Sequence, residues 1–169
     1  MNQEELIQTL EKNGKSILSL FDGLSLDKVR WKPAPGKWSL LEILNHLCDE
    51  EREDFRKRLS LVLENPEQDW PPINPEGWVQ EREYNARDLE ESLTDFKKER
   101  AKSLKWLRSL KSSNWNQERR HPRFGSIKAG DLLASWVAHD LFHIRQIVNT
   151  NLAFLSETVK PFSIQYSGA

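Results

Sequence analysis

Clusters of proline and glycine divide this chain into long segments whose apolar residues recur at helical spacing. The 169 residues contain eight prolines and seven glycines. Because proline interrupts an α-helix, the two prolines and the glycine near Pro35 forbid a continuous helix through residues 23–38. Similar breaks fall in residues 65–84 and 111–126. The spacing therefore predicts four helices, over residues 3–22, 39–64, 85–110 and 126–152.

Four helices of this length fit an all-α four-helix bundle around one core. The chain is long enough for one domain with a substantial core, so we expect a single domain over residues 1–169. The polar tail, residues 156–169, is expected to be only partly ordered. The long inter-helix loops allow a crossover topology, and Ser126 is a plausible cap for the fourth helix.

The composition excludes several classes of function. The formal net charge of −1 gives no electrostatic case for nucleic acid or an anionic membrane as a partner. The chain has no run of eighteen apolar residues, and its first residues lack the pattern of a signal peptide. Its one cysteine, Cys48, rules out an internal disulfide and fits a reducing compartment. We therefore expect a soluble, cytoplasmic protein.

The second helix has a clear start signal and carries one histidine. Ser39 and Glu42 match a capping box, and Asn65–Pro66 should end the helix near Glu64. His46 lies at the border of the apolar stripe, with several carboxylates on the same side of the helix: Glu42, Asp49, Glu50 and Glu53. Cys48 points roughly the opposite way and is interpreted as a small buried residue.

The fourth helix carries a narrow polar strip inside an otherwise apolar helix. The strip consists of Ser135, His139, His143, Gln146 and Thr150. His139 and His143 are four residues apart, which places both imidazoles on one face, one turn apart. A solvated face would be broad and charged, so this strip is buried and its groups need partners. Paired imidazoles on one helical face are half of a usual zinc-type site.

The histidines suggest a metal site. Catalytic zinc sites typically use three protein ligands and water, and His46 is the only other histidine on a core helix. We therefore expect His46, His139 and His143 to converge on one metal with an open position, where bound water or a thiolate can be activated. The candidates for orienting these ligands through hydrogen bonds are Glu42, Asp49, Glu50, Asp140 and Gln146.

One other interpretation of the histidines stays open, and a second is disfavoured. They could be core residues satisfied by hydrogen bonds, with Gln146 and the acidic residues as partners. A zinc peptidase helix reads His-Glu-x-x-His, but here Asp140 replaces the glutamate and the third histidine lies upstream, which argues against a peptidase.

Three further features have more than one interpretation. Arg100 falls on the stripe of the third helix, where it either reaches a buried acid or ligand or extends to the surface. His121 is either an exposed loop residue or a further ligand. The loop between Trp70 and Trp78 is either a wrapping segment or a lid over a pocket.

Together these motifs resemble the DinB-like superfamily of damage-inducible, YfiT-like proteins. The resemblance extends from Trp31 to about Val148 and depends on Trp38-Ser39-x-x-Glu42-Ile-Leu-x-His46, His121-Pro-x-Phe-Gly125 and Trp136-x-x-His139-Asp140-x-x-His143-x-x-Gln146. It implies an up-down-down-up bundle, often dimeric, in which one histidine of the second helix and two of the fourth hold zinc or nickel. It also implies the chemistry of a thiol S-transferase, in which the metal stabilises a low-molecular-weight thiolate that attacks an electrophilic substrate.

Three functions are consistent with the sequence. The first is a metal-dependent enzyme that activates a thiol or a metal-bound water. The second is a non-catalytic stress-response module that holds a metal or a small ligand. The third is a structural bundle that dimerises through a helix face.

Overall fold

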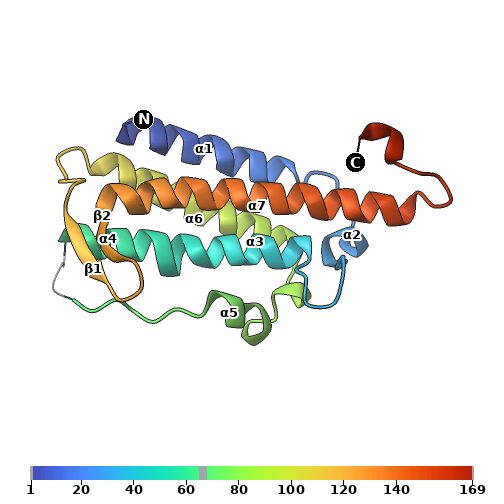
Figure 1. The fold of residues 1–169 in the computed structure, drawn as a ribbon, viewed down its shortest axis with the longest axis horizontal. Coiled ribbons are helices and arrows are strands. Elements are labelled where there is room, and N and C mark those ends of the chain that lie inside the picture. The colour runs from blue at the N-terminus through green and yellow to red at the C-terminus, as the bar shows by residue number, and fades with distance from the viewer. Residues whose placement is uncertain (1, 65–67, 169) are drawn as a thin grey trace.

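The computed structural model describes residues 2–64 and 68–168, and four long helices packed side by side dominate it (Figure 1). They are α1 (Gln3–Ser19), a long helix that contains α3 (Leu40–Asp49) and α4 (Arg56–Glu64), α6 (Leu89–Ser109) and α7 (Ala129–Thr158). In Figure 1, α1 and α7 run in one direction, and α3–α4 and α6 run in the other. The predicted all-α bundle with up-down-down-up topology is confirmed.

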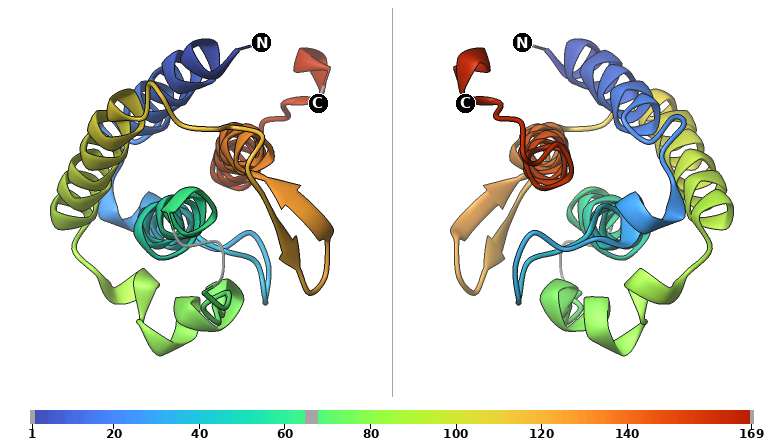
Figure 2. Two further views of the ribbon diagram at one scale, coloured as in Figure 1. Left: turned by 90° about the vertical axis from the view of Figure 1, so that its left-hand side faces the viewer. Right: turned by 90° about the vertical axis from the view of Figure 1, so that its right-hand side faces the viewer.

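Short elements occupy the predicted connections (Figure 2). The first connection contains α2 (Leu26–Arg30), and the second contains α5 (Pro75–Glu81). A 3₁₀ turn (Tyr84–Ala86) follows, so the third helix begins at Leu89 and not near residue 85 as predicted. The third connection contains an antiparallel hairpin of β1 (Glu118–His121) and β2 (Gly125–Lys128), and a last 3₁₀ turn spans Gln165–Ser167. These elements are too short to show a hydrophobic period, so the sequence pattern did not indicate them.

Both ends of the fourth helix differ from the prediction. Ser126 does not cap it, because Ser126 pairs with Arg120 inside the hairpin. The helix begins at Ala129, after Lys128 as the N-cap, and it continues to Thr158 instead of ending near residue 152. The missed hairpin explains the late start, since its second strand leads directly into the helix.

The second long helix begins as predicted and changes its geometry midway. Ser39 Oγ accepts a hydrogen bond from the Glu42 amide at 3.1 Å, and Glu42 Oε2 accepts one from the Ser39 amide at 2.8 Å. A π-helical segment, Glu50–Phe55, joins α3 to α4. Helix α4 ends at Glu64, while the predicted stop signal, Asn65–Pro66, lies outside the described residues. Wide turns of this kind are often found at functional sites, and this one starts four residues after His46.

The core consists of two apolar clusters with polar side chains between them. One cluster includes Leu44, Phe96 and Ile147, and the other includes Leu10, Leu59 and Trp136. Between these clusters along the helices lie buried polar residues from all four of them: Asn13, Glu51, Arg100 and Asp140. None of the described helices is long and apolar enough to cross a membrane. The bundle therefore contains a polar layer, and Asp140 of this layer directly follows the candidate ligand His139 in α7.

Candidate metal centre

His46, His139 and His143 converge, although His46 lies 93 residues before His139 in the chain. His139 Nε2 lies 3.4 Å from His46 Nε2 and 3.2 Å from His143 Nε2. One nitrogen from each of the three rings lies within 4.8 Å of the others. The side chain of His46 is buried, and the other two are half-buried. The three imidazoles thus point at one another at the junction of α3 and α7.

The spacing of the nitrogens fits a tetrahedral metal. With a zinc–nitrogen distance of 2.0–2.1 Å, two ligands of a tetrahedral ion lie about 3.3 Å apart. The two separations that involve His139, 3.2 and 3.4 Å, are close to this value. The residues present therefore fit an ion held by three imidazoles, with a fourth position left for another ligand.

Hydrogen bonds among the imidazoles explain the two short distances to His139 Nε2 less well than a shared metal ion does. A single ring nitrogen carries either one proton or one lone pair, so His139 Nε2 makes one linear hydrogen bond and not two. Purely structural histidines would therefore leave one of the two contacts of His139 Nε2 without a good hydrogen bond.

The histidines are kept neutral by their surroundings. Burial is the main cause that lowers the pKa of His46 to about 2, and the neighbouring charges of His143 and His139 add to it. Burial likewise lowers the pKa of His139 to about 3, with smaller contributions from His143 and Arg100. Burial also lowers the pKa of His143, while its hydrogen bond with Gln146 acts in the opposite direction. At neutral pH all three rings therefore offer lone pairs, the form that binds a metal.

Gln146 orients one of the rings. Its Oε1 lies 2.8 Å from His143 Nδ1, and because an amide oxygen only accepts, Nδ1 carries the proton. The lone pair of His143 then lies on Nε2, the nitrogen that faces the other two histidines. Gln146 is thus hydrogen-bonded to one of the three imidazoles, at the place where the sequence suggested an orienting role for it.

The candidate acids contact other groups. Asp140 binds Arg100, and Glu42 serves the capping box and pairs with Lys32. Asp49 is held by Arg82, Tyr84 and Arg52. Glu50 is buried beside Asp54, and burial followed by the charge of Asp54 raises its pKa to about 8. Within the described residues, Gln146 is therefore the one candidate with a hydrogen bond to an imidazole.

The other ambiguous residues have definite places in the structure. Arg100 reaches buried acids and does not extend to the surface. His121 lies in the hairpin, where its ring packs against Trp70 and Phe124, so it is not part of the histidine cluster. Cys48 is buried as expected, and burial raises the pKa of its thiol to about 12.

Aromatic rings and a cavity shape the access to the centre. The centroid of the Trp38 ring lies 4.8 Å from that of His46, and the centroid of the Phe55 ring lies 5.1 Å from that of His139. A cavity of 610 Å³ opens beside the cluster, with His143, Gln146 and Trp38 in its wall. This volume falls in the usual range for small-molecule sites. A small molecule in this cavity would lie next to the imidazole cluster.

These features define an α-helical bundle with a candidate three-histidine metal centre facing a cavity. A model of the DinB superfamily matches residues 9–147, and the chain belongs to this superfamily. A comparison with curated proteins gave no match.

A solved structure with the same fold is YfiT from Bacillus subtilis, described as "a probable metal-dependent hydrolase with an unusual four-helix bundle topology". The two structures superpose with a TM-score of 0.79 over 90% of this chain and 87% of YfiT, at 19% sequence identity. At this level of identity the likeness shows the fold.

Proposed function

We propose that this protein is a metal-dependent enzyme in which His46, His139 and His143 hold a divalent ion, zinc or nickel. The convergence of the three Nε2 atoms carries the proposal, because their spacing matches tetrahedral ligands. The description of YfiT as a probable metal-dependent hydrolase supports it. When bound, the ion would stabilise a thiolate or a hydroxide at neutral pH.

The side chains of the protein would prepare the site for this ion. Gln146 holds His143 in the tautomer that presents Nε2, and burial keeps the imidazoles unprotonated. Trp38 packs against His46 and Phe55 packs against His139, which limits the movement of these two rings. In the reaction that we propose, a low-molecular-weight thiol loses its proton to solvent, and its thiolate forms a C–S bond with an electrophilic carbon as the bond to the leaving group breaks. Attack by water on the same substrate class is the alternative outcome.

Metal analysis tests the centre. Protein purified without added metal should contain close to one divalent ion per chain, and His139→Ala should contain little. Saturation with zinc at a thousand times its dissociation constant should stabilise the wild type by about 4 kcal/mol. Absence of metal from the wild type, together with equal melting temperatures of both proteins in zinc, would refute the metal centre.

A second experiment distinguishes the two nucleophiles. The metal-loaded protein is incubated with monobromobimane and cysteine, and separately with 4-nitrophenyl acetate without a thiol. Faster conjugation than with His139→Ala supports thiol transfer, whereas hydrolysis that depends on His139 supports activation of water. If metal binds but neither reaction exceeds the rate of the variant, the non-catalytic metal-binding module is favoured.

We further propose that the protein is a cytoplasmic homodimer. The buried free thiol of Cys48 is compatible with a reducing compartment. Helix α7 exposes an apolar stripe that consists of Leu141, Val148, Leu152 and Leu155. A second copy of the chain, related by a two-fold axis, would cover this stripe with the same stripe.

A further inference from the structure

A second cavity lies beside the histidine cluster, on the side of the β-hairpin. It encloses 780 Å³ between α4, the hairpin, the first turns of α7 and the segment before α5. Its wall includes Phe55, which contacts His139, and Ser135, which lies one helical turn before His139. Along α7 the histidine cluster thus lies between the residues of the two cavities, Ser135 on one side and Gln146 on the other. The first cavity includes His143 itself, whereas the second approaches His139 through Phe55 and Ser135.

Two aromatic rings give the second cavity flat apolar surfaces. Trp70 is held in place because its Nε1 donates to the Arg120 carbonyl at 2.8 Å. The guanidinium groups of Arg58 and Arg119 lie 5.3 and 4.9 Å from the centre of a Trp70 ring, which further fixes the indole. Phe124 lines the same cavity and is 64% exposed, unusual for a large apolar side chain. Together these rings offer a surface for a planar or apolar group.

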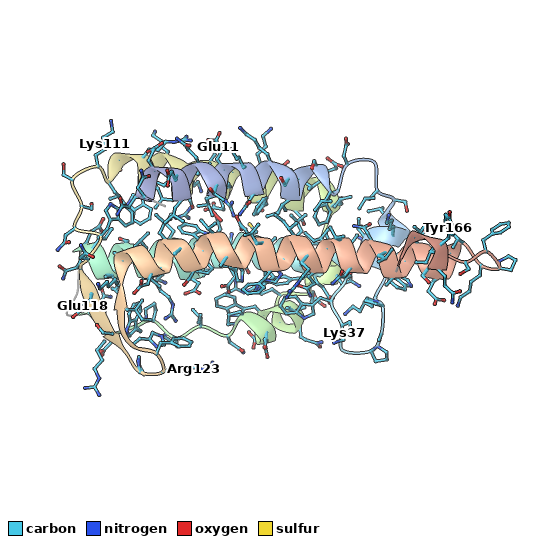
Figure 3. All side chains as sticks on the ribbon, turned by 45° about the horizontal axis from the view of Figure 1, so that its top comes forward. Glu11, Lys37, Lys111, Glu118, Arg123 and Tyr166 are labelled. Carbon is cyan, nitrogen blue, oxygen red and sulfur yellow. The ribbon has the colours of Figure 1, made fainter. Side chains whose placement is uncertain are left out.

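The hairpin adds positive charge to this surface. Residues 118–128 contain four basic side chains, Arg119, Arg120, Arg123 and Lys128, and one acidic side chain, Glu118. Arg123 lines the cavity at the tip of the hairpin (Figure 3). Its guanidinium lies 5.3 Å from the Phe124 ring centre, and it forms no ion pair with any residue that the structure describes.

The carboxylates of the cavity already have other partners. Asp54, in the π-helical segment, pairs with Arg58 of α4. Asp131 accepts the Lys128 amide at 3.0 Å and so caps the start of α7. The charge of Arg123 is therefore left for a ligand, next to the apolar surfaces of Trp70 and Phe124.

We propose that this cavity binds the anionic end of an organic ligand. A carboxylate or phosphate pairs with Arg123, and a flat or apolar body packs against Trp70 and Phe124. The proposal rests on the proposed function in one respect: the reactive end of the ligand would extend past Phe55 and Ser135 to the histidine cluster. Binding of the anionic end itself needs no metal.

Calorimetric titration of the metal-loaded protein with three naphthalene probes tests the charge requirement. The probes are naphthalene-2-carboxylate, 2-naphthyl phosphate and the neutral 2-naphthamide. We expect at least one anion to bind about tenfold more tightly than the amide, and its affinity to fall as salt is added. Which anion binds better identifies the group. Equal affinity for the amide, or no binding of either anion, would overturn the proposal.

Two matched arginine variants locate the anion. Arg123→Gln should weaken binding of the better anion by about tenfold, because the charge-assisted contact is lost. Arg145→Gln removes a charge from the wall of the other cavity and should leave the affinity unchanged. Both arginines are exposed, so neither change should affect folding. A loss with Arg145→Gln and none with Arg123→Gln would contradict the assignment.

A third variant separates this inference from the metal centre. His143→Ala alters the histidine cluster on the side away from the hairpin cavity. If the anion still binds to His143→Ala, and the added change Arg123→Gln weakens this binding, the cavity assignment stands. It then stands even if the wild type proves to contain no metal. If binding of the anions disappears in His143→Ala, the anion was bound at the histidine cluster and the cavity assignment is wrong.

Discussion

At the scale of single residues, burial determines the chemistry of the candidate site. Burial lowers the pKa of His46 to about 2 and raises that of Glu50 to about 8, so both side chains are uncharged at neutral pH. An uncharged imidazole is a ligand, whereas an uncharged carboxyl group holds a proton. For His143, the hydrogen bond from Nδ1 to Gln146 Oε1 in addition favours the tautomer whose lone pair lies on Nε2.

Removal of the Gln146 acceptor should weaken metal binding. In Gln146→Leu, His143 Nδ1 loses its hydrogen bond, and both the tautomer and the ring orientation become less well defined. We expect a loss of about 10-fold to 100-fold in metal affinity, measured by competition with a chromophoric chelator. Asn149→Leu changes the wall of the same cavity about one turn away and serves as the control. Equal affinities of Gln146→Leu and the control would show that Gln146 has no such role.

Glu50 should make the stability of the protein depend on pH. Its pKa is about 8 when folded and 4.5 in the reference state, so the folded protein retains this proton between those values. Protonated Glu50 therefore makes its full contribution to the free energy of unfolding below pH 4.5, and this contribution is lost as the pH rises through 8. Relative to Glu50→Gln, the wild type should lose on the order of 1 kcal/mol per pH unit over this window, measured by urea unfolding. Glu53→Gln is the control, and a pH-independent difference for Glu50→Gln would disprove the assignment.

At the scale of secondary-structure elements, one arginine joins all four bundle helices. Arg100 of α6 donates from Nε to Glu51 in the π-helical segment at 2.9 Å and from Nη1 to the Leu10 carbonyl of α1 at 2.7 Å. Its Nη1 and Nη2 also donate to Asp140 of α7 at 2.7 and 2.8 Å. Gly14 makes room for this side chain, since a Cβ there would lie 3.2 Å from Arg100 Cγ. Asp140 is next to His139 in the chain, so this network also sets the rotation of α7 that points His139 at His46.

Loss of Arg100 should destabilise the fold strongly. Arg100→Leu leaves Glu51 and Asp140 buried without a countercharge, and we expect a loss of about 3–5 kcal/mol in urea unfolding. Addition of Glu51→Gln and Asp140→Asn to this variant removes the uncompensated charges and should recover part of the loss. Arg108→Leu, which breaks an exposed ion pair of the same helix, should cost at most about 1 kcal/mol. A similar cost for Arg100→Leu and Arg108→Leu would contradict this role.

At the scale of the whole molecule, apolar surface on α7 is left uncovered in the single chain. Leu141 is 52% exposed, Val148 46% and Leu155 45%. These residues recur every seven positions, which aligns them on one side of the helix. Exposed apolar residues that are scattered singly are common on protein surfaces, whereas a contiguous stripe of them favours an interface with another protein chain.

A charge in this stripe should separate the proposed dimer. Val148→Glu places a carboxylate near the middle of the stripe, where a like copy would face it across the two-fold axis. We expect a dimer for the wild type and a monomer for Val148→Glu in size-exclusion chromatography with light scattering. Glu157→Gln, at an exposed position of the same helix, is the control. A monomeric wild type would show that the stripe is not a self-association surface.

The sequence by itself determined the features that depend on local spacing. Helix positions follow from the 3.6-residue period, and His139 and His143 share a face because they are one turn apart. Ser39 and Glu42 formed their capping box as predicted, since that motif needs contacts within one turn only. The family was also recognisable, because its motifs are short and occur in a characteristic order along the chain.

The tertiary structure decided the features that depend on long-range packing. The distance along the chain between His46 and His139 is 93 residues, and only the pairing of α3 with α7 brings them together. Asp140 pairs with Arg100, and His143 is hydrogen-bonded to Gln146 and not to an acidic residue. Both contacts depend on how each helix is rotated about its axis, and the spacing of residues in the sequence does not give this rotation. The sequence did not indicate the hairpin and its cavity, because strands of four residues are too short to show a hydrophobic period. The position of the hairpin is set by tertiary packing against Trp70 and α7.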